Sequence, residues 1–230
     1  GWRLDLSPFP RAIAAPADRL NRWAPQRDDL AEYLPQVAAL LETAIRDALG
    51  DRDLSPAHRE LFRHLVLATA WQESCWRHYV VSDDRKLVPL RSGTGDVGLM
   101  QVNERVWRGF YDQQRLRWDI GYNGTAGTEV LLDYLLRHAI RKGEDRHPGG
   151  IDNLARASYS AYNGGPSRLS RYRDAGASAY GRKVDRAFWD KYRQVAAGNE
   201  LAVSRCLGGN LSGRAEGGAA AAGGGAPAAV

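Results

Sequence analysis

The amino-acid sequence predicts a mainly helical protein with one small β-hairpin. In several long segments the apolar residues recur every three or four positions, which is the period of one face of an α-helix. Only the stretch from about His78 to Leu90 has the sequence pattern of a β-hairpin, with short apolar runs on either side of Asp83 and Asp84. The chain has 230 residues, of which 43% are hydrophobic. That is enough for one well-filled domain, or for a domain with appendages.

The first half of the chain contains two helices with recognisable ends. Residues 1–28 hold several prolines and no clear period, so we expect an irregular arm. A first helix is predicted at Tyr33–Leu49, because Gly50 suits the residue that follows a helix. A second is predicted at Ser55–Cys75, where serine is a preferred N-cap and Pro56 fits the first helical position.

A glycine-rich loop follows the hairpin at Ser92–Gly98, and helices then resume. They are predicted at about Asn103–Tyr111, Gly124–Lys142, Asp152–Tyr162, Ser167–Arg173 and Ser178–Ala197. From Leu207 onward the chain is mostly Gly and Ala and lacks the apolar bulk to fold, so we expect disorder. The expected organisation is an arm and packing helix at 1–54, a catalytic domain at 55–206 and a tail at 207–230.

The charge and composition of the chain limit the classes of binding partner that we expect. The formal net charge is +5, and only four of the 32 basic residues are lysines. Arginine favours partners that carry carboxylates or phosphates. The basic residues are scattered, so we expect no nucleic-acid partner. The chain contains no run of 18 apolar residues, so we expect no membrane-spanning helix. The first ten residues lack the pattern of a signal peptide, and the sequence leaves open whether one preceded them.

The chain offers no evident metal site. Its five histidines do not have the spacing of metal ligands. Two cysteines are too few for a tetrahedral zinc site unless histidines complete it. Cys75 and Cys206 are either a disulfide, if the protein is exported, or two unrelated buried thiols.

Glu73 is the strongest candidate for catalysis in the predicted Ser55–Cys75 helix. It continues the apolar stripe formed by Phe62, Val66, Thr69 and Ala70. Burial disfavours the charged form of a carboxylate and raises its pKa, so that the acid can donate a proton near neutral pH. The structural alternative is a buried glutamate paired with one of the many arginines.

Three short motifs occur in order along the chain. They are Gln72-Glu73-Ser74, then GLMQ at Gly98–Gln101, then AYNGGP at Ala161–Pro166. Together they resemble the catalytic domain of soluble lytic transglycosylases, in glycoside hydrolase family 23, which includes goose-type lysozyme. Asn123, Gly127 and Tyr134-Leu135 resemble a further element of that family, and Tyr180 is the best match to its last tyrosine. The resemblance covers about Leu61–Val195.

The resemblance implies a lysozyme-like fold in which the hairpin lies beside a cleft. It implies cleavage of the β-1,4 bond between N-acetylmuramic acid and N-acetylglucosamine without water, which leaves a 1,6-anhydro sugar. Glu73 would serve first as acid and then as base, with no metal and no other cofactor. The implied substrate-binding residues are Ser74, Gly98, Leu99, Met100, Gln101, Tyr162, Asn163 and Tyr180.

The same resemblance implies peptidoglycan as the partner, and we expect the chain to work as a monomer. Peptidoglycan lies outside the cytoplasm, so we expect export to the periplasm or cell envelope, and with it a Cys75–Cys206 disulfide.

Two alternatives stay open. The stretch between Ser74 and Gly98 is longer than usual in the family and brings in Asp83, Asp84 and Asp96. A second carboxylate facing Glu73 would permit a hydrolase that uses water. The other alternative is a non-catalytic peptidoglycan-binding module. The family also often has Glu-Thr before the last tyrosine, where this chain has Ala175–Ser178, so the role of Tyr180 depends on an incomplete motif.

Overall fold

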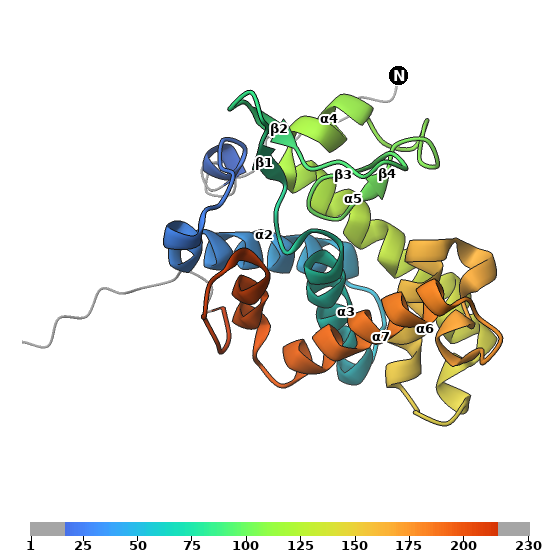
Figure 1. The fold of residues 1–230 in the computed structure, drawn as a ribbon. Helices are drawn as coiled ribbons and strands as arrows, with labels where there is room; N and C mark the ends of the chain where they lie inside the picture. Colours follow the sequence, from blue (N-terminus) through green and yellow to red (C-terminus); the bar gives the residue numbers. More distant parts are fainter. Residues whose placement is uncertain (1–16, 216–230) are drawn as a thin grey trace, which may run out of the picture.

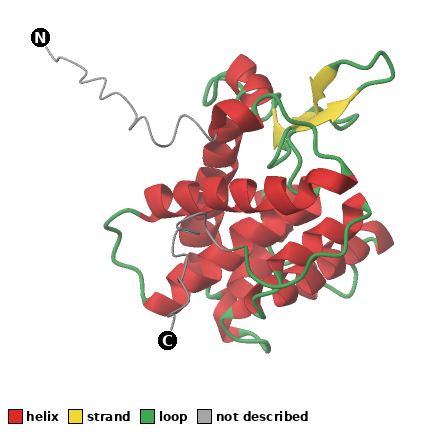
Figure 2. Cartoon of the chain, turned by 90° about the vertical axis from the view of Figure 1, so that its left-hand side faces the viewer, coloured by secondary structure: helices red, strands yellow, loops and turns green. Residues whose placement is uncertain are grey.

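The computed structural model describes residues 17–215, which form a body of packed helices with the strands gathered at one end (Figures 1 and 2). The longer helices are α2 (Leu30–Leu49), α3 (Pro56–Ser74), α4 (Gln113–Trp118), α5 (Ile120–Asp133), α6 (Asp152–Gly164) and α7 (Ala179–Ala196). A π-helical segment, η2 (Tyr134–Ile140), continues α5. Short 3-10 helices are η1 (Arg27–Asp29), η3 (Glu144–Arg146), η4 (Pro166–Arg168), η5 (Arg171–Arg173) and η6 (Glu200–Leu207).

Helix α3 lies at the centre and packs against α2, α6 and α7 (Figure 1). Its start is the predicted one, because the Ser55 hydroxyl accepts a hydrogen bond from the His58 amide at 3.2 Å and Pro56 follows the cap. The helix ends at Cys75, whose φ of 54° is left-handed. Its apolar face is buried, and this packing against the neighbouring helices stabilises the helix.

The predicted hairpin is confirmed. Strands β1 (Tyr79–Val81) and β2 (Leu87–Pro89) pair antiparallel, with Val80 opposite Val88. The Arg85 amide closes the turn on the Ser82 carbonyl at 2.8 Å, and Asp83 and Asp84 are exposed within it. A second antiparallel pair, β3 (Asp96–Val97) with β4 (Val102–Asn103), was not predicted, because strands of two residues leave no period to detect.

The helix predicted at Asn103–Tyr111 is wrong. The Asn103 side-chain oxygen accepts hydrogen bonds from the amides of Arg105 and Val106 at 3.0 Å, as an N-cap does, but the turn that follows does not continue into a helix. Gly109 then has a φ of +86°. Helix α4 begins only at Gln113, after Asp112 caps it. The predicted helix at Ser167–Arg173 is likewise reduced to the 3-10 turns η4 and η5.

Both ends of the described region pack on the helices. The Asn21 side-chain oxygen accepts from the Tyr79 hydroxyl at 3.3 Å and from the Ile120 amide at 2.8 Å. At the other end the Leu211 amide donates to the Ser204 hydroxyl at 2.9 Å. The rest of the predicted arm (residues 1–16) and of the predicted disordered tail (216–230) lies outside the described residues. Within residues 17–215 no helix combines the length and apolarity needed to cross a bilayer.

Helix α5 approaches the segment Gly98–Gln101 so closely that Gly127 has no room for a side chain. A Cβ at this position would lie 2.3 Å from the Met100 Cβ. We therefore expect Gly127→Ala to reduce the free energy of unfolding by roughly 1–3 kcal/mol, because the buried helix and loop must separate. Urea unfolding measures the change. Gly93→Ala is the matched control, because no atom lies within 4 Å of a Cβ there; equal losses in both variants would contradict the expectation.

Candidate active site

Glu73 lies in the last turn of α3 and is only partly accessible to solvent. Its Oε1 accepts a hydrogen bond from the Tyr159 hydroxyl of α6 at 2.8 Å. The Tyr159 ring is 1% exposed and stacks on Phe188 of α7, with centroids 4.1 Å apart and planes within 4°. Three helices therefore determine where this carboxyl group lies.

Burial raises the pKa of Glu73 to about 7. The charge of Asp96 raises it further, whereas the Tyr159 hydrogen bond and the charge of Arg171 act in the opposite direction. No ion pair among residues 17–215 includes Glu73, which argues against the structural alternative of a glutamate neutralised by arginine. A carboxylic acid with such a pKa is half protonated near neutral pH, as a general acid requires.

Asp96 of β3 is the second carboxylate of this neighbourhood. It accepts hydrogen bonds from Ser92 at 2.6 Å, Thr94 at 2.5 Å and the Asn103 amide at 2.8 Å. Burial alone would raise the pKa of Asp96, but these hydrogen bonds outweigh it and hold the pKa below its ordinary value. The two carboxyl groups therefore differ in protonation at neutral pH, with Asp96 ionised and Glu73 poised to donate.

The segment Gly98–Gln101 is held beside the end of α3 by contacts from several elements. The Ser74 hydroxyl donates to the Leu99 carbonyl at 2.6 Å. The Met100 amide donates to the Asn123 side chain of α5 at 2.8 Å, and the Tyr162 hydroxyl of α6 donates to the Met100 carbonyl at 2.6 Å. All three sequence motifs therefore meet at one place, although they are far apart along the chain.

Gly98 and His78 pack together beneath this segment. Gly98 is buried with a φ of +76°, and a Cβ there would lie 2.3 Å from the His78 ring. The Leu99 amide donates to His78 Nδ1 at 3.0 Å, so Nε2 carries the proton and donates to the Arg117 carbonyl at 2.9 Å. Burial lowers the pKa of His78 to about 4. The ring is therefore neutral at physiological pH and links the hairpin, the motif and α4.

The predicted substrate-binding residues differ in accessibility. Leu99 and Met100 are completely buried, so their side chains support the segment from within. Gln101 is partly exposed, and its amide donates to the Gly98 carbonyl at 2.9 Å. Tyr162 is partly exposed, Asn163 is exposed, and Tyr180 at the start of α7 is 73% exposed. Within the described residues, cavities of about 330 and 320 Å³ lie elsewhere, and Glu73 lines neither of them.

Sequence reasoning did not single out Tyr159 and Arg171, which both act on the pKa of Glu73. Tyr159 stands one helical turn before Tyr162 and therefore shares its face, a signal that the spacing alone could have supplied. Arg171 makes two hydrogen bonds with Asp185, at 2.8 and 2.7 Å. No local pattern marks it, because its nearness to Glu73 depends on how η5 and α7 pack.

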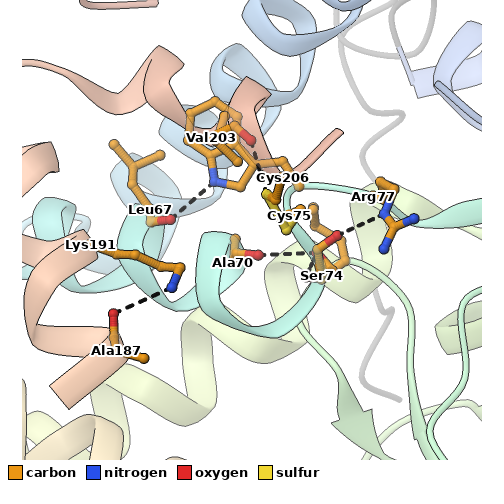
Figure 3. The surroundings of a disulfide bond; sticks show 11 residues. Leu67, Ala70, Ser74, Cys75, Arg77, Ala187, Lys191, Val203 and Cys206 are labelled. Carbon is orange, nitrogen blue, oxygen red and sulfur yellow. Dashed lines mark hydrogen bonds between the residues drawn. A yellow bond between two sulfur atoms is a disulfide. The ribbon is translucent and has the colours of Figure 1, made fainter. Parts of the chain in front are cut away.

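The predicted disulfide joins Cys75, directly after the end of α3, to Cys206 of η6 (Figure 3). The two Cα atoms are 6.4 Å apart, and 131 positions separate the cysteines along the chain. The bond thus ties the C-terminal segment to the helix end that carries Glu73. The Ser74 hydroxyl also lies 3.0 Å from the Ala70 carbonyl oxygen, so its one O–H group is shared between two acceptors near the bridge (Figure 3).

Comparison with known proteins agrees with this geometry. A family model described as "Transglycosylase SLT domain" matches residues 57–184, more than half of the 230-residue chain. No curated protein and no solved structure matches the chain. The matched region extends from the first turn of α3 into α7 and contains Glu73, Gly98–Gln101 and Tyr162. The chain belongs to the transglycosylase SLT domain family.

Proposed function

We propose that the protein is a peptidoglycan lytic transglycosylase in which Glu73 alone serves as acid and base. The observation that carries the proposal is the carboxyl group of Glu73, whose pKa burial raises to about 7 at the point where the family's three motifs meet. A general acid is most effective when its pKa lies near the working pH. A pure binding module would gain nothing from an acid held in this state.

The chemistry needs two successive proton transfers at one carboxyl group. Protonated Glu73 gives its proton to the oxygen of the β-1,4 bond, and that bond breaks as N-acetylglucosamine leaves. The N-acetyl group of N-acetylmuramic acid stabilises the positive charge that develops at its anomeric carbon. The carboxylate of Glu73 then takes the proton of the C6 hydroxyl of the same sugar, and the oxygen closes the 1,6-anhydro ring. Glu73 ends protonated, and no water is consumed.

The second candidate function is a hydrolase that uses Asp96 as base or stabilising carboxylate. The observation in its favour is that the charge of Asp96 acts on Glu73, as a carboxylate in the same site would. Asp83 and Asp84, the other two acids predicted for this role, lie exposed in the turn of the hairpin and are not among the groups that shift the pKa of Glu73.

The variant Asp96→Asn separates the two candidates. A transglycosylase should keep its rate at low pH within roughly fivefold, because Glu73 does all the proton transfer; general bases contribute about 10²- to 10⁴-fold. Removing the Asp96 charge should also lower the pKa of Glu73 and move the pH profile to lower values. A rate reduced by about 100-fold at every pH would instead assign Asp96 a direct role.

The pH dependence of cleavage follows from the raised pKa of Glu73. The free enzyme needs Glu73 protonated, so kcat/KM should be steady below about pH 6, reach half its maximum at about pH 7 and fall about tenfold per pH unit above about pH 8. Initial rates of soluble fragment release from purified peptidoglycan, measured from pH 5 to 9, provide the check. A profile that stays flat up to pH 9 would show that no acid with this pKa limits the reaction.

Tyr159→Phe should move that profile. The hydroxyl of Tyr159 lowers the pKa of Glu73, so its loss should shift the decline in activity to higher pH. Tyr172→Phe is the matched control, because it also removes a tyrosine hydroxyl from a carboxylate, that of Glu144. If both variants keep the parental profile, Tyr159 does not set the proton affinity of Glu73.

We further propose that the protein works as a monomer outside the cytoplasm, in the periplasm or cell envelope. The substrate class lies there, and disulfides such as Cys75–Cys206 persist in oxidising compartments. The net charge of +5 suits an anionic wall polymer. Fractionation of cells that naturally make the protein tests the location, and recovery in the cytoplasm would contradict it.

A further inference from the structure

The loop that joins β4 to α4, residues 104–112, presents apolar side chains to solvent. Phe110 is 77% exposed and Val106 is 66% exposed. The ring of Trp107 meets that of Phe110 edge to face, with centroids 5.8 Å apart. Single exposed apolar residues are ordinary. Two of them on one short loop, with Phe110 packed on the Trp107 ring, indicate a contact surface.

The 104–112 loop is anchored to the candidate active site. At its start the Asn103 amide donates to Asp96 at 2.8 Å. At its end the Tyr111 hydroxyl donates to Glu129 of α5 at 2.8 Å. Burial raises the pKa of Tyr162 most, and the charges of Glu73, Asp96 and Tyr111 add to the rise, so these side chains share one neighbourhood. The loop is thus continuous with the site and held at both ends.

The same loop carries two exposed arginines, Arg105 and Arg108. Among the described residues neither takes part in an ion pair. The side chain of Arg105 lies over Gly95, next to Asp96, with its Nε 3.7 Å from where a Gly95 Cβ would be. Two guanidinium groups without carboxylate partners are suited to carboxylates of a ligand, which they can bind bidentately.

We propose that the 104–112 loop is a binding platform for the peptidoglycan strand beside the scissile bond. A sugar ring lies with its C–H face on Phe110, and carboxylates of the stem peptide pair with Arg105 and Arg108. The proposal rests on the proposed function. A glycan strand continues beyond the two sugars whose bond is cut, and this loop is an apolar and cationic surface continuous with the site.

The test uses the full chain with Glu73→Gln, so that the ligand survives. Binding is measured to purified insoluble peptidoglycan by depletion and to soluble chitin oligosaccharides, which carry no carboxylates, by tryptophan fluorescence. Adding Phe110→Ser should weaken both interactions by about tenfold, the scale of one lost aromatic contact. Adding Arg105→Gln with Arg108→Gln should weaken binding to peptidoglycan and leave binding to the neutral oligosaccharide unchanged.

The hairpin supplies matched controls. Val81 is 53% exposed, and Arg85 and Lys86 are exposed in its turn, so Val81→Ser and the pair Arg85→Gln with Lys86→Gln remove similar groups elsewhere. These variants should bind like the parent. Losses equal to those of the loop variants would overturn the proposal.

Two further outcomes would also overturn the proposal, and they differ in what they say about the proposed function. If Phe110→Ser binds peptidoglycan normally but loses affinity for vesicles of anionic phospholipid, the loop is a membrane contact. The proposed function would then stand, provided that the chain with Glu73 intact still cleaves peptidoglycan. If that chain neither binds nor cleaves peptidoglycan, the proposed function fails together with the platform.

Discussion

Replacing Glu73 by glutamine is expected to reduce peptidoglycan cleavage by about 10³-fold or more, near the upper range for the loss of a general acid and base. The amide has nearly the same size and can still accept the Tyr159 hydrogen bond, but it cannot transfer a proton. The measurement is the rate at which soluble fragments leave purified peptidoglycan. Glu60→Gln is the control, because Glu60 lies on the same helix with a side chain 67% exposed. A reduction below tenfold for Glu73→Gln would remove this residue from the chemistry.

The same variant should be more stable than the parent at high pH. The folded-state pKa of Glu73, about 7, lies above its ordinary value of 4.5, so the ionised carboxylate destabilises the folded protein above pH 7. The destabilisation is relieved as the pH falls from 7 to 4.5. We expect Glu73→Gln to raise the free energy of unfolding at pH 8 by roughly 1–3 kcal/mol, toward the lower end because the carboxyl is partly accessible.

Urea unfolding at pH 8 and at pH 4.5 measures this difference. The gain should be present at pH 8 and nearly absent at pH 4.5, where the parental carboxyl is protonated in the folded state. An equal gain at both values would mean that the amide stabilises by better packing rather than by removing a buried charge. His78 contributes the opposite trend in both proteins, because its folded-state pKa of about 4 lies below its ordinary value of 6.5, and it therefore cancels in the comparison.

Removing the disulfide is expected to have the second large effect. The bond joins residues 131 positions apart, and closing so long a loop stabilises a protein by roughly 4–5 kcal/mol in the chain-entropy model, an upper figure. The double variant Cys75→Ser with Cys206→Ser should therefore unfold at much lower urea concentration than the parent.

The parent in a strong thiol reductant is the control for this variant. Both should lose similar stability, because both lack the covalent link, whereas the serine variant should be indifferent to the reductant. A loss below about 1 kcal/mol in both would show that other contacts alone hold η6 against the body. Among them is the ion pair between Arg63 and the buried Glu200, at 3.2 Å.

The features that sequence could predict are those whose cause is local. Ser55 and Pro56 predict the start of α3 because capping depends on adjacent residues. The place of Glu73 on the buried face follows from helical spacing, and Phe62, Val66, Thr69 and Ala70 are all completely buried. The pairing of Cys75 with Cys206 required one assumption, that of export, because only two cysteines are present.

The features that sequence could not predict depend on packing between distant segments. At 103–111 the local apolar spacing favoured a helix, but the chain leaves the helical path at Gly109, whose φ of +86° is left-handed. Glycines 98 and 127 look like flexible positions in the sequence, yet each lies against the side chain of another segment. Arg171 reaches the neighbourhood of Glu73 only because Asp185 of α7 holds it there.

The most direct test of the account is mass spectrometry of the fragments that the protein releases from purified peptidoglycan in water enriched in ¹⁸O. A transglycosylase should release fragments that end in 1,6-anhydro-N-acetylmuramic acid, lighter by one water than hydrolysis products and free of the label. They should be absent when Glu73→Gln replaces the parent. Reducing ends that carry ¹⁸O would contradict the account and identify a hydrolase, with Asp96 the first residue to examine.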